Sequence, residues 1–418
     1  MAAKKDPTPA PATPAAPAAK APAAKAPAAK APAQQPASKT DQVRDIMQLQ
    51  YAMFDEMTKQ QIKTLHAFQL LMDPPTVDVG TTRSEEIFSK NRMRLLHYLP
   101  TCEQAHRTPL LFVYAVINRP YILDLQPDKS VVKKFVDAGF DVYMIDWGYP
   151  SIGDEHIGHT DYIDNYVNAA VDHIRERTGS KKVSLLGYCI GGYFTTIYSA
   201  CHPEKVANLM VMAAPLYFGI DHGLLHIWTK DKSFDPQKVV EVYGSAPADF
   251  LNGGFAMLDP LPNTVMKYYG LFQNVDNEDF VMNFLRMEKW IKDGIAIPGR
   301  FYSEFIKMGY QENRLMNGTL TIADHLVNLK NIDMPVLVIV GATDHLVPMG
   351  STKPLYDRVS SKVKDIFEFP TGHIGLSVSS RSHRELWPKV VDWLAKNTDE
   401  QNGGAPAAKP KASRSKKR

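Results

Sequence analysis

Cysteine is scarce in this chain of 418 residues, and its distribution excludes one class of protein. Cys102, Cys189 and Cys201 are too few and too scattered for a disulfide framework. Long apolar runs are also missing, because no stretch approaches the roughly 18 consecutive apolar residues that a membrane-spanning helix needs. The first forty residues, mostly Ala, Pro and Lys, lack the apolar core of a secretory signal. We therefore expect a reducing, cytoplasmic setting in which one thiol can be reactive.

Motifs for phosphate and metal binding are absent as well. No Walker-type or dinucleotide-binding glycine loop occurs in the sequence. His222 and His226 have the i, i+4 spacing of helical metal ligands, but no glutamate motif accompanies them. The sequence therefore predicts no metal site and no bound cofactor.

Charge is unevenly distributed along the chain. The net charge is +3, yet residues 1–40 carry +5, from six lysines and one aspartate, and residues 401–418 carry +6, which leaves −8 for the part between them. Segments so rich in alanine, proline and lysine cannot bury enough apolar surface to fold. We expect disordered tails at 1–40 and 397–418. They act either as solubilising segments or as weak electrostatic contacts with nucleic acid or another anionic surface.

The part between the tails begins with a helical pattern. From Asp41 to about Met72, apolar residues recur at helical spacing, and Pro74-Pro75 follow. This pattern predicts an amphipathic helix or a pair of helices. Its apolar face can pack on the body of the protein or on a partner subunit, and both alternatives stay open.

Further along, short apolar runs alternate with amphipathic helical patterns. The apolar runs are Leu110–Tyr114, Val142–Asp146, Val183–Leu186, Leu209–Ala213, Val336–Val340 and Ile366–Phe369. The helical patterns are Ser130–Ala138, Tyr162–Arg177, Ser351–Ser361 and Glu385–Lys396. The alternation predicts a mostly parallel, doubly wound α/β sheet in one domain, residues 41–396. About 120 residues without a clear strand interrupt it, so we expect a helical cap at about 215–334, either over an apolar substrate channel or as a structural insertion.

The third apolar run leads into Gly187-Tyr-Cys189-Ile-Gly191-Gly, which precedes another helical pattern. Strand, glycine-flanked nucleophile and helix form the nucleophile elbow of the α/β-hydrolase fold, here with cysteine in place of serine. The glycines allow strand and helix to approach around a strained turn, and the helix N-terminus stabilises a thiolate. We therefore expect Cys189 to be the nucleophile and the N–H of Ile190 to be one oxyanion donor. Cys102 and Cys201 lack this setting and are expected to be structural.

The elbow predicts an acid and then a histidine downstream, each just past a strand. Asp344 follows the fifth apolar run, and His373 follows the sixth, between two glycines. We interpret Cys189, Asp344 and His373 as a catalytic triad, and His345 as a residue that supports the loop. The second oxyanion donor should come from the loop after the first apolar run, where the N–H groups around Val116, Ile117 and Asn118 are candidates.

Cysteine as nucleophile favours one kind of chemistry. An acyl group on serine is an oxygen ester, about as stable as the ester of a polymer, so its transfer to an alcohol gains little. An acyl group on Cys189 remains a thioester, which forms from a CoA thioester at nearly equal energy and passes downhill to a hydroxyl. The residue therefore suits thioester substrates and ester products.

At these residues the chain resembles the polyhydroxyalkanoate synthases. The resemblance covers about residues 45–396 and, besides the elbow, includes Asp146-Trp147-Gly148, Asn118 with Tyr121-Ile-Leu-Asp-Leu, Asn313-Arg314-Leu315, Asp344-His345-Leu-Val-Pro, Gly372-His373-Ile-Gly, Val378-Ser-Ser-Arg and Trp393-Leu394. It implies that Cys189 is the nucleophile, His373 its base, and Asp344 the residue that helps to activate the incoming hydroxyl. It also implies an acyltransferase that polymerises (R)-3-hydroxyacyl-CoA, with 3-hydroxybutyryl-CoA as the expected substrate, at the surface of cytoplasmic polyester granules.

The resemblance bears on partners too. A single domain of this length resembles the short class of these synthases, which implies a homodimer and a separate second subunit. The Ala/Lys/Pro tails depart from the family pattern. Two other functions remain as alternatives: a thioesterase or dienelactone-type hydrolase with a cysteine elbow, and a non-catalytic granule or nucleoid adaptor that uses the basic tails. The intact triad argues against the adaptor.

Overall fold

The computed structural model describes residues 38–220, 222–231 and 233–399, and the chain divides into two compact units, residues 1–61 and 62–418. The predicted tails at 1–40 and 397–418 lie outside the described residues except at their inner ends. There, residues 39–40 begin the first helix and residues 397–399 end the last one. Regular structure therefore extends slightly into both segments that the sequence assigned to tails.

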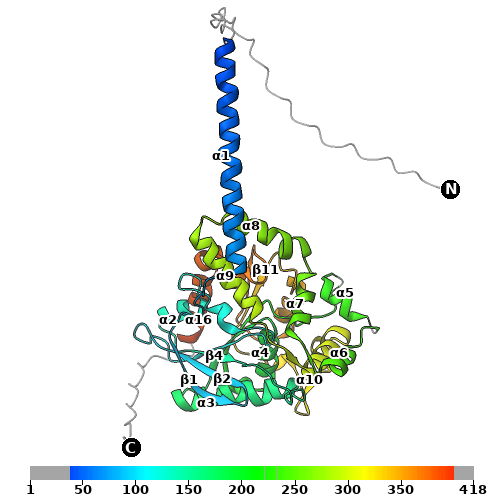
Figure 1. Cartoon of the computed structure of the whole chain (residues 1–418). Coiled ribbons are helices and arrows are strands. Elements are labelled where there is room, and N and C mark those ends of the chain that lie inside the picture. Colours follow the sequence, from blue (N-terminus) through cyan, green and yellow to red (C-terminus); the bar gives the residue numbers. More distant parts are fainter. Residues whose placement is uncertain (1–37, 221, 232, 400–418) are drawn as a thin grey trace, which may run out of the picture. The chain divides into compact units, whose positions relative to one another are not determined.

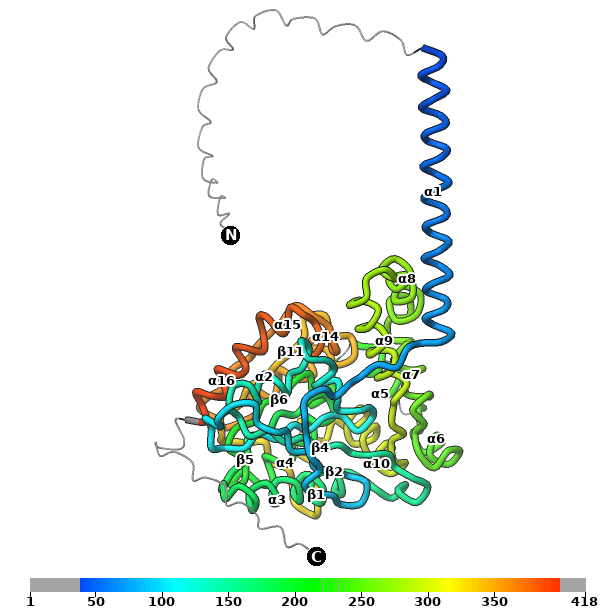
Figure 2. Tube along the Cα trace, turned by 60° about the vertical axis from the view of Figure 1, so that its left-hand side comes forward, coloured from blue at the N-terminus to red at the C-terminus, as the bar shows by residue number. Residues whose placement is uncertain are grey.

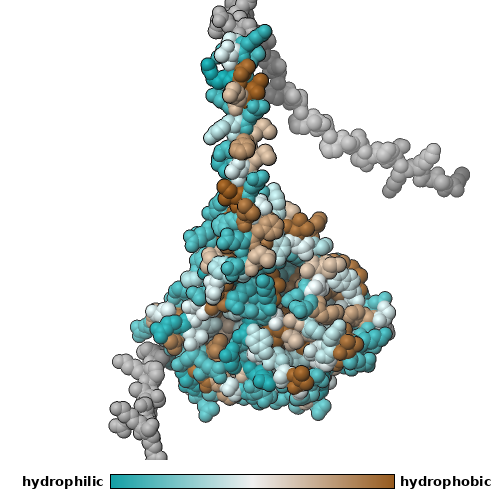
Figure 3. Space-filling model, viewed as in Figure 1, coloured by the Kyte–Doolittle hydropathy of each residue, from teal (hydrophilic) through white to brown (hydrophobic). Residues whose placement is uncertain are grey.

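The first described element is one continuous helix, α1 (Lys39–Met72), where the sequence predicted a helix or a pair (Figure 1). The hydroxyl of Ser38 accepts a hydrogen bond from the Asp41 N–H at 3.2 Å and so caps the first turn. Pro74 and Pro75 follow its end, as expected for residues that cannot continue a helix. Its large apolar side chains are mostly exposed and appear as brown atoms along the helix in Figure 3.

The described residues of the second unit form an eight-stranded sheet in the order β1-β2-β4-β3-β5-β6-β11-β12. The strands are β1 (Ser84–Lys90), β2 (Met93–Tyr98), β3 (Leu110–Val113), β4 (Val142–Asp146), β5 (Val183–Tyr188), β6 (Val206–Met212), β11 (Val336–Gly341) and β12 (Lys364–Phe369). The last six pair in parallel, while β1 and β2 form an antiparallel hairpin at one edge. The six predicted apolar runs are thus confirmed as the parallel strands of an α/β-hydrolase sheet.

Two groups of helices pack on this sheet (Figure 1). In one group, α2 (Val131–Asp137) meets α16 (Trp387–Asp399) through Phe135 and Trp387, whose ring centroids are 6.2 Å apart. Before α16 the chain forms α14 (Gly375–Val378) and α15 (Ser380–Glu385), which follow one another along one side in Figure 2.

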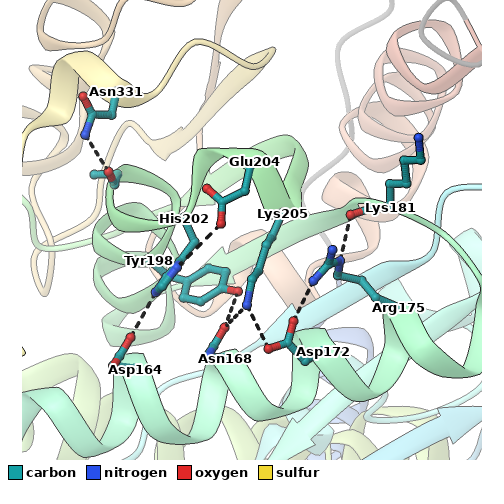
Figure 4. A network of polar contacts seen from close by, with 11 residues as sticks. Asp164, Asn168, Asp172, Arg175, Lys181, Tyr198, His202, Glu204, Lys205 and Asn331 are labelled. Carbon is teal, nitrogen blue, oxygen red and sulfur yellow. Dashed lines mark hydrogen bonds and ion pairs between the residues drawn. The ribbon is translucent and has the colours of Figure 1, made fainter.

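The other group contains α3 (Asn168–Thr178), which continues the π-helical turn Asp161–Val167, and α4 (Ile190–Cys201). Figure 4 shows the polar network between them: Lys205, in the 3-10 turn Pro203–Lys205 after α4, donates to Asn168 and Asp172 on α3, both at 2.8 Å. These contacts hold the C-terminal end of α4, the helix that starts at the elbow.

The segment between β6 and β11, here called the cap (residues 215–334), is mainly helical and is coloured green to yellow in Figure 1. Its helices are α5 (Leu224–Lys230), α6 (Pro236–Tyr243), α7 (Ala248–Ala256), α8 (Lys267–Gln273), α9 (Glu278–Lys292), α10 (Gly299–Glu304) and α11 (Arg314–Asn317), with π-helical turns at Leu261–Met266 and Phe305–Gln311. Two antiparallel pairs of two-residue strands lie in its described part: β7 (Ser245–Ala246) with β8 (Ile297–Pro298), and the hairpin of β9 (Thr321–Ile322) with β10 (His325–Leu326). The cap meets the elbow helix through aromatic pairs such as Phe305 with Tyr193, 5.4 Å apart.

Some predicted elements differ from those observed. The helix expected at Ser351–Ser361 is two short helices, α12 (Met349–Thr352) and α13 (Leu355–Arg358), because Pro354 interrupts the helical hydrogen bonding. The hairpin β1–β2 was not predicted, since β1 lies at the sheet edge and reads Ser-Glu-Glu-Ile-Phe-Ser-Lys, with little apolar periodicity. Short 3-10 turns at Pro120–Leu123 and Leu329–Asn331 complete the described elements.

Candidate active site

Cys189 occupies a strained turn between β5 and α4. Its backbone has φ +58° and ψ −128°, a conformation that residues with a Cβ rarely adopt. Gly191 faces the end of β3 so closely that a Cβ there would overlap the Val113 carbonyl. A Cβ on Gly192 would lie only 2.6 Å from the Ala214 Cβ, so this glycine too is required for the approach of the helix. The predicted elbow is therefore observed, and it presents a buried Cys189, 5% exposed, at the carboxyl edge of the sheet.

His373 and Asp344 come together from the loops after β12 and β11. The imidazole Nδ1 lies 2.7 Å from Asp344 Oδ2. The other carboxylate oxygen, Oδ1, accepts hydrogen bonds from the N–H groups of Leu346 and Val347 at 2.9 and 2.8 Å. Every oxygen of this fully buried carboxylate is thus occupied, and its position is fixed.

The electrostatic state of His373 depends on both of its partners. Burial lowers its pKa, but the negative charges of Asp344 and Cys189, together with the hydrogen bond to Asp344, raise it from 6.5 to about 10. His373 therefore holds its proton more tightly than an ordinary histidine does. The backbone of the histidine is held as well, because the Tyr188 hydroxyl donates to the His373 carbonyl at 2.9 Å.

The predicted oxyanion donors belong to the start of α4 and to the loop after β3. Ile190 is the first residue of α4, and its N–H has no hydrogen-bond acceptor among residues 38–220, 222–231 and 233–399. The loop after β3 lies beside the elbow, because Val113 pairs with Gly187 in the neighbouring strand. Ile117 is placed in this loop, and its carbonyl accepts a hydrogen bond from the Ile295 N–H of the cap at 2.9 Å.

Residues of the cap that the sequence did not assign to the active site also approach it. Tyr310, on the π-helical turn Phe305–Gln311, is buried, and burial with the charge of Cys189 raises its pKa. His226 on α5 packs against the Tyr310 ring, 5.0 Å away, and burial lowers the pKa of His226 to about 4. Tyr310 belongs to no spaced motif, and the i, i+4 spacing of His226 with His222 suggested metal ligands, so only the packing of the cap reveals the place of these two residues.

Other candidates from the sequence lie outside the triad. Cys102 is exposed, and burial raises the pKa of the half-buried Cys201 to about 11, so that its thiol stays protonated at neutral pH. His345 is exposed, whereas His373 is the histidine that is hydrogen-bonded to Asp344. His222 and His226 join no cluster of three metal-binding side chains within the described residues. None of the helices described there is long and apolar enough to cross a membrane.

Comparison with known proteins relates this geometry to a family. A profile of the alpha/beta hydrolase fold matches residues 108–379, and a profile of the poly-beta-hydroxybutyrate polymerase (PhaC) N-terminus matches residues 37–135. The poly(3-hydroxyalkanoate) polymerase subunit PhaC of Haloferax mediterranei is 48% identical to this chain, over 77% of this chain and 66% of that subunit. The subunit of the same name from Allochromatium vinosum is 38% identical, over 81% of this chain and 97% of that subunit.

Among solved structures, a monoacylglycerol lipase of Paleococcus ferrophilus matches with 17% identity and a TM-score of 0.47, over 71% of this chain and 96% of the lipase. The chain spans about two thirds of the Haloferax subunit and nearly all of the Allochromatium subunit. With matched profiles over most of its length and a relative covered almost end to end, this chain belongs to the poly(3-hydroxyalkanoate) polymerase (PhaC) family of the α/β-hydrolase fold.

Proposed function

We propose that this chain polymerises (R)-3-hydroxyacyl-CoA, with 3-hydroxybutyryl-CoA as its expected substrate, into polyester through a thioester on Cys189. The observation that carries the proposal is the convergence of a strained cysteine elbow with a buried His373–Asp344 pair in a chain of the polymerase family. The CoA thioester is the substrate and supplies the energy of each transfer, so the proposed reaction uses no further cofactor.

The first step transfers the acyl group from CoA to the enzyme. The Cys189 thiolate attacks the thioester carbon, a bond from carbon to Sγ forms, and the bond from carbon to the CoA sulfur breaks. The His373 imidazolium, whose pKa is raised to about 10, gives its proton to the departing CoA thiolate. The Ile190 N–H and an N–H of the loop after β3 stabilise the oxyanion formed on the way.

The second step joins hydroxyacyl units. A hydroxyl group attacks the acyl carbon on Cys189, a C–O ester bond forms, the C–S bond breaks, and the hydroxyl proton passes to His373. Because Asp344 is hydrogen-bonded directly to His373, we assign this carboxylate the role of stabilising the imidazolium that forms. Transfer from thioester to ester is downhill, which drives chain growth.

The partners in this proposal are the growing polyester, a granule surface, a second copy of the chain and a second synthase subunit. Exposed apolar side chains along α1 provide surface for contacts of this kind (Figure 3). A weak contact with nucleic acid is assigned to the basic tails, which lie almost wholly outside the described residues.

Incubation of the purified protein with 3-hydroxybutyryl-CoA tests the proposal against its two alternatives. Release of CoA together with rising turbidity supports polymerisation. Release of CoA with free hydroxy acid identifies a thioesterase, and absence of CoA release identifies a non-catalytic adaptor. Cys201→Ala is the matched control for Cys189→Ala, since its half-buried thiol lies at the far end of α4.

A further inference from the structure

One short stretch of the cap is tied to the loop that follows β3. Six consecutive residues, 290–295, make three hydrogen bonds to the five residues 117–121. The bonds run from the Trp290 indole N–H to the Arg119 carbonyl (2.9 Å), from the Ile295 N–H to the Ile117 carbonyl (2.9 Å), and from the Tyr121 hydroxyl to the Asp293 carboxylate (2.7 Å). The end of α9 and the residues after it thus hold this loop at three successive points.

The loop held in this way is the one expected to supply the second oxyanion donor. Val113 and Gly187 pair in adjacent parallel strands, so the residues that follow Val113 lie beside Cys189. In a trans peptide the carbonyl and the next N–H point in opposite directions. A cap residue that binds the Ile117 carbonyl therefore also sets the direction of the Asn118 N–H, away from that cap residue.

The loop is held from the sheet side as well. The Trp147 indole, after β4, donates to the Tyr114 carbonyl at 2.9 Å, and the Arg119 guanidinium donates to Asp146 at 2.8 Å. These anchors lie at the end of strand β4, or just after it, in the sheet that also carries Cys189, so the loop is held between the sheet and residues 290–295. Ile295 sets the direction of the Asn118 N–H, and Trp290 fixes the loop two residues further on, at the Arg119 carbonyl; these two cap residues are 1% and 7% exposed.

We propose that residues 290–295 orient the second oxyanion donor, with Trp290 as a positioning residue. The rate of acyl transfer then depends on the position of this part of the cap relative to the loop after β3. The inference rests on the proposed function of Cys189. Trp290 touches no reacting atom and acts through the Arg119 carbonyl. Its buried hydrogen bond is strong because little water competes for it, and its loss leaves a buried carbonyl unpaired.

Trp290→Phe tests this assignment, because phenylalanine keeps an aromatic ring and removes only the indole N–H. Two reactions of Cys189 are compared: acylation, measured as the burst of CoA from 3-hydroxybutyryl-CoA, and alkylation by iodoacetamide, which forms no oxyanion. Loss of a whole oxyanion donor costs about 100-fold or more, so its misplacement should slow the burst about tenfold. We expect the alkylation rate to stay unchanged and KM to change less than about twofold.

Trp393→Phe is the matched control, since the Trp393 indole donates to Asp365 at 2.7 Å, on α16 and away from the elbow. It should leave both reactions unchanged. Tyr121→Phe, which removes the bond to Asp293, should slow the burst selectively as well, and the double variant with Trp290→Phe should lose less than the product of the two effects.

Two results would overturn the inference: a Trp290→Phe burst as fast as in the unmodified protein, or an equal slowing of burst and alkylation, which marks a merely structural role. Failure of the underlying function looks different. If the protein without substitutions still releases CoA after iodoacetamide has alkylated Cys189, then Cys189 is not the nucleophile, whatever the effect of Trp290→Phe.

Discussion

The carboxylate of Asp344 is occupied on both oxygens, by two backbone N–H groups and by His373. A group held in this way is well placed to orient and stabilise an imidazolium on His373. In the proposed mechanism a thiolate attacks in the acylation step, whereas chain growth requires a much less acidic alcohol to lose its proton during the attack. We therefore expect Asp344 to matter more for chain growth than for the first acylation.

Asp344→Asn keeps the size and one acceptor while removing the charge. The variant should give a stoichiometric burst of CoA and an acylated Cys189, followed by a steady rate lowered at least 100-fold; replacing the triad acid by an amide elsewhere costs about 10⁴-fold. Rapid-quench measurement of burst and steady state separates the two phases. An equal loss in both would make Asp344 a general member of the triad, and no loss in either would assign the acid to another residue.

The main residues of the site were predictable because each of them needs a particular local sequence around it as well as a particular position in the fold. Cys189 needs glycines around a strained turn, and Asp344 and His373 each follow a predicted strand. Tyr310 and Trp290 were not predictable, because their positions depend on how the cap packs, and packing leaves no periodic signal. The pattern of the cap predicted helices but not which helix end would touch the loop after β3.

At the scale of elements, the elbow is a close contact between the start of α4 and the end of β3. A Cβ on Gly191 would overlap the Val113 carbonyl, and that carbonyl belongs to a central strand that cannot yield easily. Gly191→Ala should therefore lower the free energy of unfolding by about 1–3 kcal/mol and abolish most CoA release. Thermal unfolding and the CoA assay measure the two effects.

Gly253→Ala is the matched control on α7, where nothing lies within 4 Å of the added Cβ. It should leave CoA release intact and raise stability by about 0.5–1 kcal/mol, because alanine is the better helix former. Tolerance of Gly191→Ala, with full activity and an unchanged melting temperature, would show that the contact between α4 and β3 is looser than described.

Helix α5 of the cap carries a buried histidine that makes the cap sensitive to acid. Burial, with smaller contributions from His222 and Lys230, lowers the pKa of His226 to about 4, while an unfolded histidine titrates near 6.5. Its two ring nitrogens have no hydrogen-bond partner in the described part of the chain. Because the unfolded state binds the proton more readily, the contribution of His226 to stability is complete above pH 6.5 and falls as the pH decreases toward 4.

His226→Phe should remove this dependence while keeping a ring against Tyr310. Melting temperatures measured between pH 7 and pH 4.5 should fall less steeply for the variant than for the unmodified protein. His325→Phe, at an exposed position in β10, should leave the slope unchanged. Equal slopes for all three proteins would mean that His226 does not titrate differently on unfolding.

At the scale of elements, the central strands of the sheet were easier to predict from the sequence than strand β1 at its edge. The central parallel strands β3, β4, β5, β6 and β11 are buried along their whole length and therefore read as continuous apolar runs, whereas the edge strand β12 is half exposed. Strand β1 is half exposed, so its sequence resembles a loop, and only its pairing with β2 through the turn at Asn91, φ +55°, makes it a strand.

At the scale of the whole molecule, an acidic body is flanked by basic segments. The parts at 1–40 and 401–418 carry +5 and +6, while the rest carries −8. Binding of such segments to DNA would release counterions and weaken steeply with salt. Deleting 1–37 and 400–418 spares Ser38, which caps α1, and should abolish a mobility shift of DNA at low salt while leaving CoA release unchanged. A shift that survives both deletions would place the contact on the body.

The account as a whole depends on Cys189 as the carrier of the growing chain. The most direct measurement is mass spectrometry of peptides from protein quenched during reaction with 3-hydroxybutyryl-CoA. We predict hydroxybutyryl units on the peptide that contains Cys189, in the unmodified protein and in Cys201→Ala, and none in Cys189→Ala, which should also release no CoA. Acyl groups on any other residue, or CoA release by Cys189→Ala, would contradict the account.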